Sequence, residues 1–428
     1  MITKSRIIYP LVIFIAMASA AHAQYGQYGT NGQNSPYTRY GFGQLSDQAT
    51  GANKAMGGIG IGLRGKAQIN AINPASYSAV DSMTFLFDGG ITLQNTNFNE
   101  NGIKKNIRNS SFDYLAMQFR LKKKLGITIG MLPYSNIGYN FSTSETLTNA
   151  GDYEDITSTR SYYGEGGLNQ VFVGLGYEAF KNFSVGVNAS YLYGNLKHTI
   201  VSSFSQTSAN TTERIYEADI YTYKLDFGLQ YSYDINKKWN VTVGGIFSLG
   251  HDIGSNARII NASQNNTTSV TVADTTNISR AFQLPYSYGG GITVTYNNKL
   301  TLGFDYTLQK YGSTKFFGEN RMLCDRIKYA FGLEYLPNSY SRNYLNRIKY
   351  KAGAYYSDPY ARVDGHPGAR EYGVTAGFSL PIGRSLINIS GQYVKISPKT
   401  AGLLKENRLG VCVGFTFNEA WFKKWKME

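Results

Sequence analysis

The sequence predicts an all-β fold: a transmembrane antiparallel β-barrel of about fourteen strands with an N-terminal hatch inside its lumen. The first observation is a period-two alternation, as in residues 170–179, where Val171, Val173 and Leu175 are interleaved with mostly small or polar residues. The second is a secretion signal ahead of these stretches. Because successive side chains of a strand point to opposite faces, one face suits lipid and the other a hydrophilic lumen.

Residues 1–23 are expected to form the cleavable signal. Lys4 and Arg6 give it a positive start, and an apolar run follows up to a small-x-small cleavage site before Gln24. A membrane anchor is the alternative, but the run is short for a spanning helix. The expected location is therefore the outer membrane of a Gram-negative cell, crossed by many strands.

The composition agrees with one barrel that uses the whole mature chain. The 428 residues include 35 Tyr, 23 Phe and 47 Gly, with 10 Pro. A soluble protein of this length would need several β-domains, yet no linker or composition break separates any. We expect an arm and hatch at 24–82, the barrel at 83–418 and a periplasmic tail at 419–428.

The net charge of +14 does not indicate nucleic-acid binding. The basic residues form no stripe with interleaved aromatics, and many fall in predicted turns such as Lys122-Lys123-Lys124. Strand ends near anionic head groups account for them. The expected partners are outer-membrane lipids and a small hydrophobic ligand, with no nucleic acid, and a monomer is expected.

Fourteen stretches are predicted to be strands, each named here by a central residue. The centres are Phe87, Met117, Ile129, Val173, Val187, Leu225, Val243, Ile292, Phe304, Phe331, Ala352, Ala376, Ile389 and Val413. Long polar connections alternate with tight ones, as external loops and periplasmic turns do in such barrels. The long ones are predicted at 95–110, 143–166, 198–213, 251–282, 310–323, 357–369 and 396–404. The link 337–346 is an exception, because it is long although the alternation predicts a tight turn at this point.

Residues 24–82 do not alternate like the wall. Residues 24–43 fit either a disordered arm or a segment inside the lumen. Two motifs follow, a Gly-rich run, Ala55 to Gly62, and a turn-initiating Asn-Pro-Ala. No P-loop Lys-Ser/Thr accompanies the glycines, so a compact irregular hatch is expected rather than a nucleotide site. Its predicted key residues are Gly57, Gly58, Gly60, Asn73, Pro74 and Ala75.

The segment AMGGIGIGLR, then NPAS, then fourteen strands resembles the FadL/TodX-type outer-membrane transporters of hydrophobic compounds, and more narrowly their Bacteroidetes branch. The resemblance implies an N-terminal hatch closing the barrel. It also implies an inward kink in the third strand that opens the wall sideways. Some Bacteroidetes barrels resembling this family serve protein secretion as docking or shuttle components, so that role stays open.

Pro133 is the candidate for the kink and the lateral gate. Proline cannot donate to a strand ladder and is confined to edges and bulges. The alternation resumes after it through Ile137, Tyr139 and Phe141, which favours an interruption of the strand over its end.

The predicted lumen mixes apolar and charged side chains. An apolar wall with a basic group, Arg120 or Lys224, is proposed to hold a fatty-acid carboxylate; the alternative is that the lumenal charges pair with one another. The candidate ligand-binding residues are Leu86, Tyr114, Arg120, Leu132, Phe172, Leu192, Lys224 and Ile246.

No enzyme, cofactor or metal site is expected. His198, His251 and His366 lie at strand ends or in predicted loops, with no Ser–His pairing or zinc-ligand spacing around them. Whether Cys324 and Cys412 pair is left open. The leading functional hypothesis is passive uptake of small hydrophobic molecules, with a docking role in secretion or a structural barrel without flux as alternatives.

Overall fold

The computed structural model describes most of the chain. The described residues are 34–100, 103–147, 155–206, 208–265, 267–268, 270–363, 365–398 and 404–420. The predicted signal at 1–23, the first part of the arm at 24–33 and most of the predicted tail, 421–428, lie outside them.

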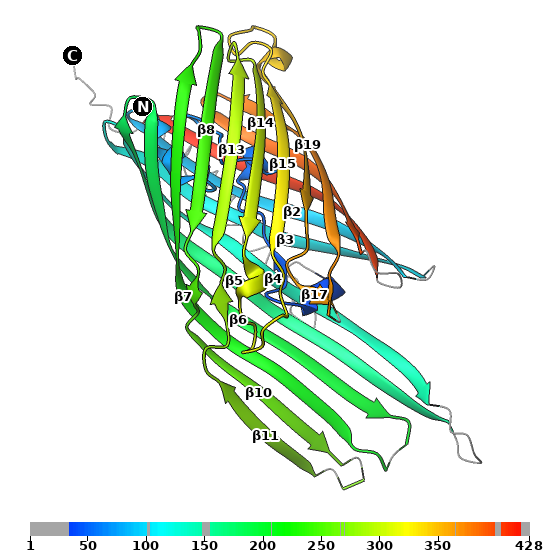
Figure 1. Cartoon of the computed structure of the whole chain (residues 1–428). Coiled ribbons are helices and arrows are strands. Elements are labelled where there is room, and N and C mark those ends of the chain that lie inside the picture. The colour runs from blue at the N-terminus through cyan, green and yellow to red at the C-terminus, as the bar shows by residue number, and fades with distance from the viewer. Residues whose placement is uncertain are drawn as a thin grey trace, which may run out of the picture.

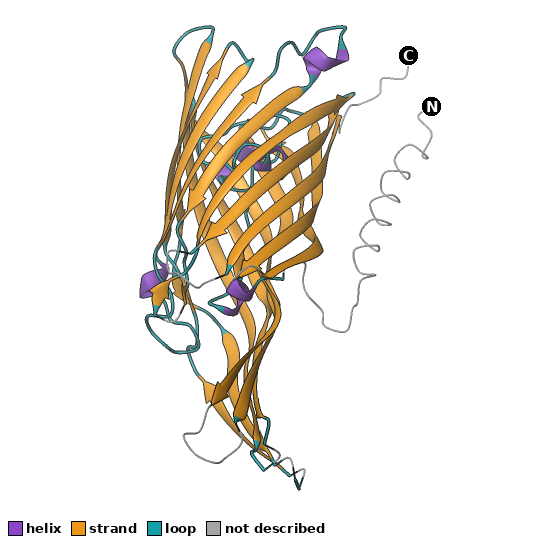
Figure 2. Cartoon of the chain, turned by 90° about the vertical axis from the view of Figure 1, so that its right-hand side faces the viewer, coloured by secondary structure: helices purple, strands orange, loops and turns teal. Residues whose placement is uncertain are grey.

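Within this part of the chain, fourteen antiparallel strands form a closed wall (Figures 1 and 2). Each pairs with its neighbours, and β2 closes the ring because it pairs with both β3 and β21. The wall strands are β2 (Thr84–Glu100), β3 (Ile103–Lys122), β4 (Leu125–Leu147), β5 (Ile156–Phe180), β6 (Phe183–Phe204), β7 (Thr211–Asp234), β8 (Trp239–Ser248), β13 (Ser287–Tyr296), β14 (Leu300–Gln309), β15 (Arg326–Tyr335), β16 (Lys349–Ser357), β19 (Arg370–Ile382), β20 (Ser385–Ser397) and β21 (Lys405–Ala420).

The predicted barrel is confirmed, and each predicted centre lies in a different wall strand. The predicted outer face is also correct: Val173, Tyr177, Tyr223 and Val413 are exposed on the wall, while the intervening positions are mostly buried or half-buried. A continuous exposed apolar surface of this kind requires an apolar surrounding, as a bilayer provides.

The two ends of the barrel differ. At one end, the turn side, the links are tight, as at residues 123–124, 181–182 and 383–384, and this side agrees with the sequence prediction. At the other end, the hairpin side, several predicted loops are mostly strand. Residues 95–110 form a hairpin of β2 and β3 around residues 101–102, so that loop prediction was wrong. Polar Thr, Ser and Asn extend these strands because pairing uses the main chain and does not require apolar side chains.

β4 to β7 reach well beyond the barrel on the hairpin side (Figure 1). β5 and β7 have 25 and 24 residues, whereas β8 and β13 have 10 each. The predicted loop at 251–282 adds a hairpin, β10 (Ser255–Gln264) and β11 (Thr271–Ile278), and β10 pairs with the far half of β7. We call this six-stranded extension of β4–β7, β10 and β11 the blade.

The short elements lie inside the barrel or at its ends. They are η1 (Pro36–Arg39), β1 (Gln44–Leu45), α2 (Gly51–Lys54), η2 (Pro74–Ala79), β9 (His251–Asp252), β12 (Gln283–Leu284), η3 (Tyr311–Ser313), η4 (Tyr344–Arg347), β17 (Arg362–Val363) and β18 (His366–Pro367). None of the described helices is long and apolar enough to span a membrane. Cys324 and Cys412 are both free thiols.

Candidate functional site

The segment before the wall enters the lumen in two parts. We call residues 34–48 the strap and residues 50–80 the plug. The strap lies along β4 toward the hairpin side, and the plug lies near the turn side, inside the ring of strands (Figure 2). The two parts are joined directly through Ala49.

The plug rests on a row of wall glycines. Gly126, Gly176, Gly186 and Gly228 are successive cross-strand partners on β4, β5, β6 and β7. A Cβ on Gly186 would lie 2.3 Å from the carbonyl carbon of Pro74, and one on Gly176 would lie 2.5 Å from the Pro74 oxygen. No side chain fits between wall and plug at these positions, so the glycines form a fitted seat for η2.

Asn73 fixes η2 to the seat. Its side chain is fully buried and accepts a hydrogen bond from the Ala75 N–H at 3.1 Å, which caps the helix. Its amide donates to the main-chain oxygens of Ile61, at 2.7 Å, and Leu229, at 3.2 Å. One side chain therefore ties η2, the Gly-rich run and strand β7 together.

The Gly-rich run is held by wall side chains. The N–H groups of Gly60 and Ile61 donate to one carboxylate oxygen of Asp305 at 2.6 and 2.8 Å, and that of Gly57 donates to Thr375 at 2.9 Å. Gly57 and Gly58 have φ of 69° and 76°, a conformation that side chains rarely adopt. The glycines therefore let the main chain approach the wall directly.

A buried ion pair joins the plug to β3. Lys54 Nζ lies 2.7 Å from a carboxylate oxygen of Asp113, which also accepts hydrogen bonds from Thr92 and Cys412. Burial is the largest single influence and acts to lower the pKa of Lys54, but the groups around it, Asp113 foremost with Cys412 and Asp47, together outweigh burial, so the pKa is raised and Lys54 stays charged.

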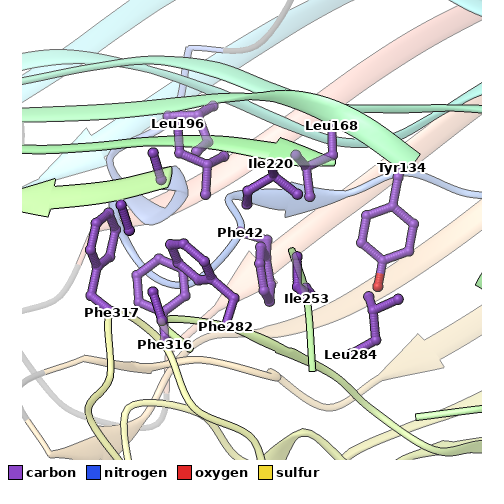
Figure 3. Packing of buried hydrophobic residues seen from close by; sticks show 14 of the residues in the cluster. Phe42, Tyr134, Leu168, Leu196, Ile220, Ile253, Phe282, Leu284, Phe316 and Phe317 are labelled. Carbon is purple, nitrogen blue, oxygen red and sulfur yellow. The ribbon is translucent and has the colours of Figure 1, made fainter. Parts of the chain in front are cut away.

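An apolar cap covers the lumen on the hairpin side. It is made by Phe42 of the strap, Phe282 from the link to β13, and Phe316 and Phe317 from the link to β15 (Figure 3). The rings of Phe42 and Phe316 are 5.4 Å apart and meet edge to face. Residues 251–282 and 310–323 were predicted to be polar external loops; their apolar parts instead fold back over the opening.

A cavity of about 270 Å³ lies between plug and cap. Leu132, Phe172 and Ile246 are among its apolar lining residues, and five acidic and five basic side chains also line it. Several of these are paired, as Lys224 with Asp226 and Lys328 with Asp47, at 3.5 Å in the second pair. These residues therefore pair with one another, which was the alternative to a free basic group that binds a carboxylate.

The wall is split beside this cavity. β3 and β4 pair from Lys122↔Leu125 to Leu115↔Met131, and the described parts of both strands continue past this point without pairing to each other. We call the unpaired boundary the seam. Extending the register by two residues would bring Pro133 opposite Asp113, which itself lies at a register shift against β2. The pairing of β3 with β4 thus ends where Pro133, which has no N–H to donate, would face the bulge at Asp113.

Pro133 also begins a change of register toward β5. Tyr134 is an extra residue in that pairing, since Pro133 pairs with Asn169 and Ser135 with Leu168. The bulge turns Tyr134 inward, where its hydroxyl lies 2.8 Å from that of Tyr311 in the cap. β4 thus continues through Pro133 as one strand, with a register shift between Pro133 and Ser135, and the role of Pro133 as a lateral gate stays a prediction.

The structure brings together half of the predicted ligand-binding residues. Leu132, Phe172, Lys224 and Ile246 line the cavity. Tyr114 and Leu86 instead pack around the plug, in clusters with Tyr77 and with Ile69 respectively.

Two further candidates lie elsewhere. Leu192 is buried in the cap cluster. Arg120 lies near the turn side, donates to the oxygen of Lys122 and is not among the residues that line the cavity, so its carboxylate-binding role stays a prediction. It lies two residues before Lys122, where β3 ends.

Sequence reasoning missed the cap and the glycine seat, while for residues 24–43 it left a place inside the lumen open as one of two alternatives, and the described part of the strap lies there. The cap left a signal, since Ala281-Phe282 and Phe316-Phe317 are apolar pairs within otherwise polar links. The seat left a weaker one, a glycine at an inward position in each of four successive strands. Among the described residues, no group of three or more His, Cys, Asp or Glu side chains is placed to hold a metal ion.

Several solved structures have a similar fold. The Pseudomonas putida toluene transporter TodX matches at a TM-score of 0.58 and 12% identity, covering 89% of this chain and 100% of its own. The Ralstonia pickettii toluene transporter TbuX matches at a TM-score of 0.57 and 13% identity, covering 86% of this chain and 98% of its own. A Pseudomonas aeruginosa FadL homologue matches at a TM-score of 0.57 and 10% identity, covering 88% of this chain and 99% of its own.

The predicted resemblance to FadL/TodX-type barrels is thus confirmed for the fold. No curated protein matches the chain. The family model described as BamG matches residues 1–428, and the protein belongs to the BamG family.

Proposed function

We propose that the protein is an outer-membrane channel for passive uptake of small hydrophobic molecules, which leave the lumen sideways through the seam. The observation that carries this proposal is the split between β3 and β4 directly beside a lumenal cavity. Leu132 and Pro133 of β4 and Phe112 and Asp113 of β3 all line that cavity. The cavity therefore reaches the part of the wall where β3 and β4 do not pair.

The orientation follows from the links. Outer-membrane barrels carry short turns on the periplasmic side and longer connections outside, so the turn side faces the periplasm and the blade faces outward. The plug then lies toward the periplasm and the apolar cap toward the exterior. A ligand that enters from outside meets the cap first, which suits a hydrophobic molecule better than a hydrated one.

The lining favours an amphipathic ligand within this class. The charges that line the cavity balance, so no net field attracts an anion. Lys224 is already paired with Asp226, and a carboxylate would have to compete with that partner. An apolar chain against Leu132, Phe172 and Ile246, with a polar group toward the charged side, fits both parts of the lining.

Uptake into liposomes tests the proposal. The mature protein is reconstituted, and entry of oleate and of toluene is compared with empty liposomes. We expect faster entry with the protein, and slower entry with Pro133→Val, because valine restores the missing N–H at the seam. If the reconstituted, folded protein adds nothing to either rate, uptake is not its function. If Pro133→Val matches the parent, the lateral route is wrong.

A docking role is the second candidate, and the blade favours it. β11 is an edge strand whose eight residues are almost all exposed, and it pairs with β10 on one side. Such an edge can pair with a wide range of extended segments, because main-chain groups do the pairing. Gentle purification distinguishes the two roles: a bound acyl chain identified by mass spectrometry supports transport, and a stoichiometric protein partner supports docking.

A further inference from the structure

The link between β15 and β16 differs from the tight links of the turn side. Residues 336–348 include η4 and extend beyond the ends of the two strands (Figure 1). Hydrogen bonds within the link hold its shape: Asn343 caps η4 by accepting from the Leu345 N–H at 3.1 Å, and the Asn338 N–H donates to the Asn346 oxygen at 2.9 Å. We call this folded link the foot.

The foot lies beside the lipid-facing side of the wall. Tyr335, Tyr350 and Phe378 are cross-strand partners on β15, β16 and β19, so they share one face of the sheet. Tyr335 and Phe378 are exposed, which makes this the outer face. The Tyr350 hydroxyl donates to the oxygen of Leu345 at 3.1 Å. η4 is therefore held next to the aromatic surface that faces the membrane.

The foot exposes large apolar side chains at this place. Tyr340 is 95% exposed and Leu345 is 60% exposed. A tyrosine ring suits a membrane interface, because its body is apolar and its hydroxyl remains hydrated. The foot thus continues the exposed apolar surface of the wall into the region of the lipid head groups.

The charges of the foot are all positive. Arg342 and Arg347 are exposed, and none of the ion pairs among the described residues includes them. The sequence of the foot has no Asp or Glu. The acidic residue just before it, Glu334, is on the opposite face of β15 from Tyr335 and pairs with Lys349 at 2.9 Å. Both guanidinium groups are therefore available to an anion from outside.

Two neighbouring links add to this positive surface. The Leu336 N–H donates to the oxygen of Lys299, in the link between β13 and β14, at 2.7 Å. The Tyr344 hydroxyl donates to the oxygen of Pro381 at 3.3 Å, near the end of β19 and the link that holds Arg384. The exposed basic residues on these three links are Lys299, Arg342, Arg347 and Arg384.

We propose that the foot binds an anionic phospholipid of the leaflet on the turn side: Arg342 and Arg347 contact the lipid phosphate, while Tyr340 and Leu345 enter the head-group layer. A guanidinium group suits a phosphate because its planar donors match the phosphate oxygens. The foot adjoins the lipid-facing wall and carries the charge opposite to that of anionic head groups, which makes lipid the occupant. The inference goes beyond uptake and does not depend on it.

Native mass spectrometry of the mature protein tests the site. The protein is placed in nanodiscs of phosphatidylcholine with a minor share of phosphatidylglycerol, and the lipids that remain bound after release are counted. We expect phosphatidylglycerol to be retained in excess of its share. Arg342→Gln with Arg347→Gln should remove about one retained phosphatidylglycerol per protein, because the two cations that hold its phosphate are gone.

Arg160→Gln with Arg214→Gln is the matched control. It removes the same charge from two exposed arginines of the blade, at the other end of the barrel, and should retain as much phosphatidylglycerol as the parent. Heat-modifiable migration on gels shows that each variant is folded.

A fluorescent label gives a second, independent measurement. Tyr340→Cys, in a background with Cys324→Ser and Cys412→Ser, is labelled with an environment-sensitive fluorophore and reconstituted into vesicles of the same two lipids. We expect its emission to shift to shorter wavelength than that of the same label at Ser144→Cys, an exposed position on the blade.

The outcomes decide between lipid and other occupants. Loss of phosphatidylglycerol from the foot variant alone, together with the shifted label, supports the proposal. Equal retention in the two double variants overturns the site. A label at position 340 whose emission matches that of the blade label overturns contact with the bilayer, and the foot is then a surface for a periplasmic protein. None of these results changes the outcome of the uptake experiment.

Discussion

The plug and the strap are neighbours in sequence, yet they are held in opposite ways. The plug meets the wall through glycines, so that its main chain lies where side chains would otherwise stand. The strap meets the wall through hydrogen bonds along a strand edge. The first contact depends on shape and tolerates no displacement, whereas the second depends on bonds that water or another strand can replace. One barrel therefore contains a fixed closure and a removable one.

The largest expected effect comes from filling the glycine seat with Gly186→Leu. The first carbon alone would lie 2.3 Å from Pro74 and 2.5 Å from the Ala75 nitrogen, so η2 must leave the seat. We expect a loss of about 1–3 kcal/mol of stability and a clear rise in ion leak. Thermal unfolding on gels and conductance in planar bilayers measure the two.

Gly290→Leu is the control for this substitution. Gly290 lies on the exposed face of β13, and a Cβ there meets no described atom within 4 Å. It should change neither quantity. Equal leak in the two variants would show that the seat does not hold the plug.

A smaller effect is expected from Asn73→Ala. The change removes the amide that donates to the Ile61 and Leu229 oxygens, of which the Ile61 oxygen keeps a bond from Gln230 at 3.0 Å, and it leaves the buried Ala75 N–H without its acceptor. Stability should fall by about 1–3 kcal/mol, with less leak than for Gly186→Leu because the seat remains. Asn343→Ala is the matched control, since Asn343 caps η4 in the same way but is exposed.

The mildest effect is expected from loosening the strap. Ser35→Ala with Thr38→Ala removes buried hydroxyl contacts to Glu406 and to the Gly138 oxygen. Each bond contributes about 1 kcal/mol, so the strap should leave β4 more often, and oleate entry should rise while ion leak stays constant. The exposed pair Ser144→Ala with Thr159→Ala, on the blade, provides the comparison. A rise in leak equal to the rise in oleate entry would mean that the strap and the plug move together.

The repeating part of the fold was predictable, because apolar residues alternate with small or polar residues along each strand. Every strand centre and the tight links followed from it, and Pro133 was visible as a break in it. The seat was not predictable in the same way. Gly126, Gly176, Gly186 and Gly228 lie on different strands, and only the register of the sheet aligns them.

The strap was harder still to predict. Its contacts with β4 run through main-chain groups, which every residue carries, so Gln44 and Leu45 show no pattern of their own. The position of Arg120 outside the cavity has a related cause. Alternation gives the face on which a side chain lies but not its depth along the barrel axis, and depth decided which candidates reached the cavity.

The fitted seat has a consequence for how the molecule is made. A segment whose main chain lies within 2.5 Å of the place of a missing Cβ cannot be pushed into a finished barrel. We therefore expect the plug to be in place while β4 to β7 assemble, before β2 joins β21. The plug precedes every wall strand in the sequence, so it is synthesised before the strands that pack around it. We expect a chain lacking residues 50–80 to close more slowly than the full chain, which time-resolved gel migration would measure.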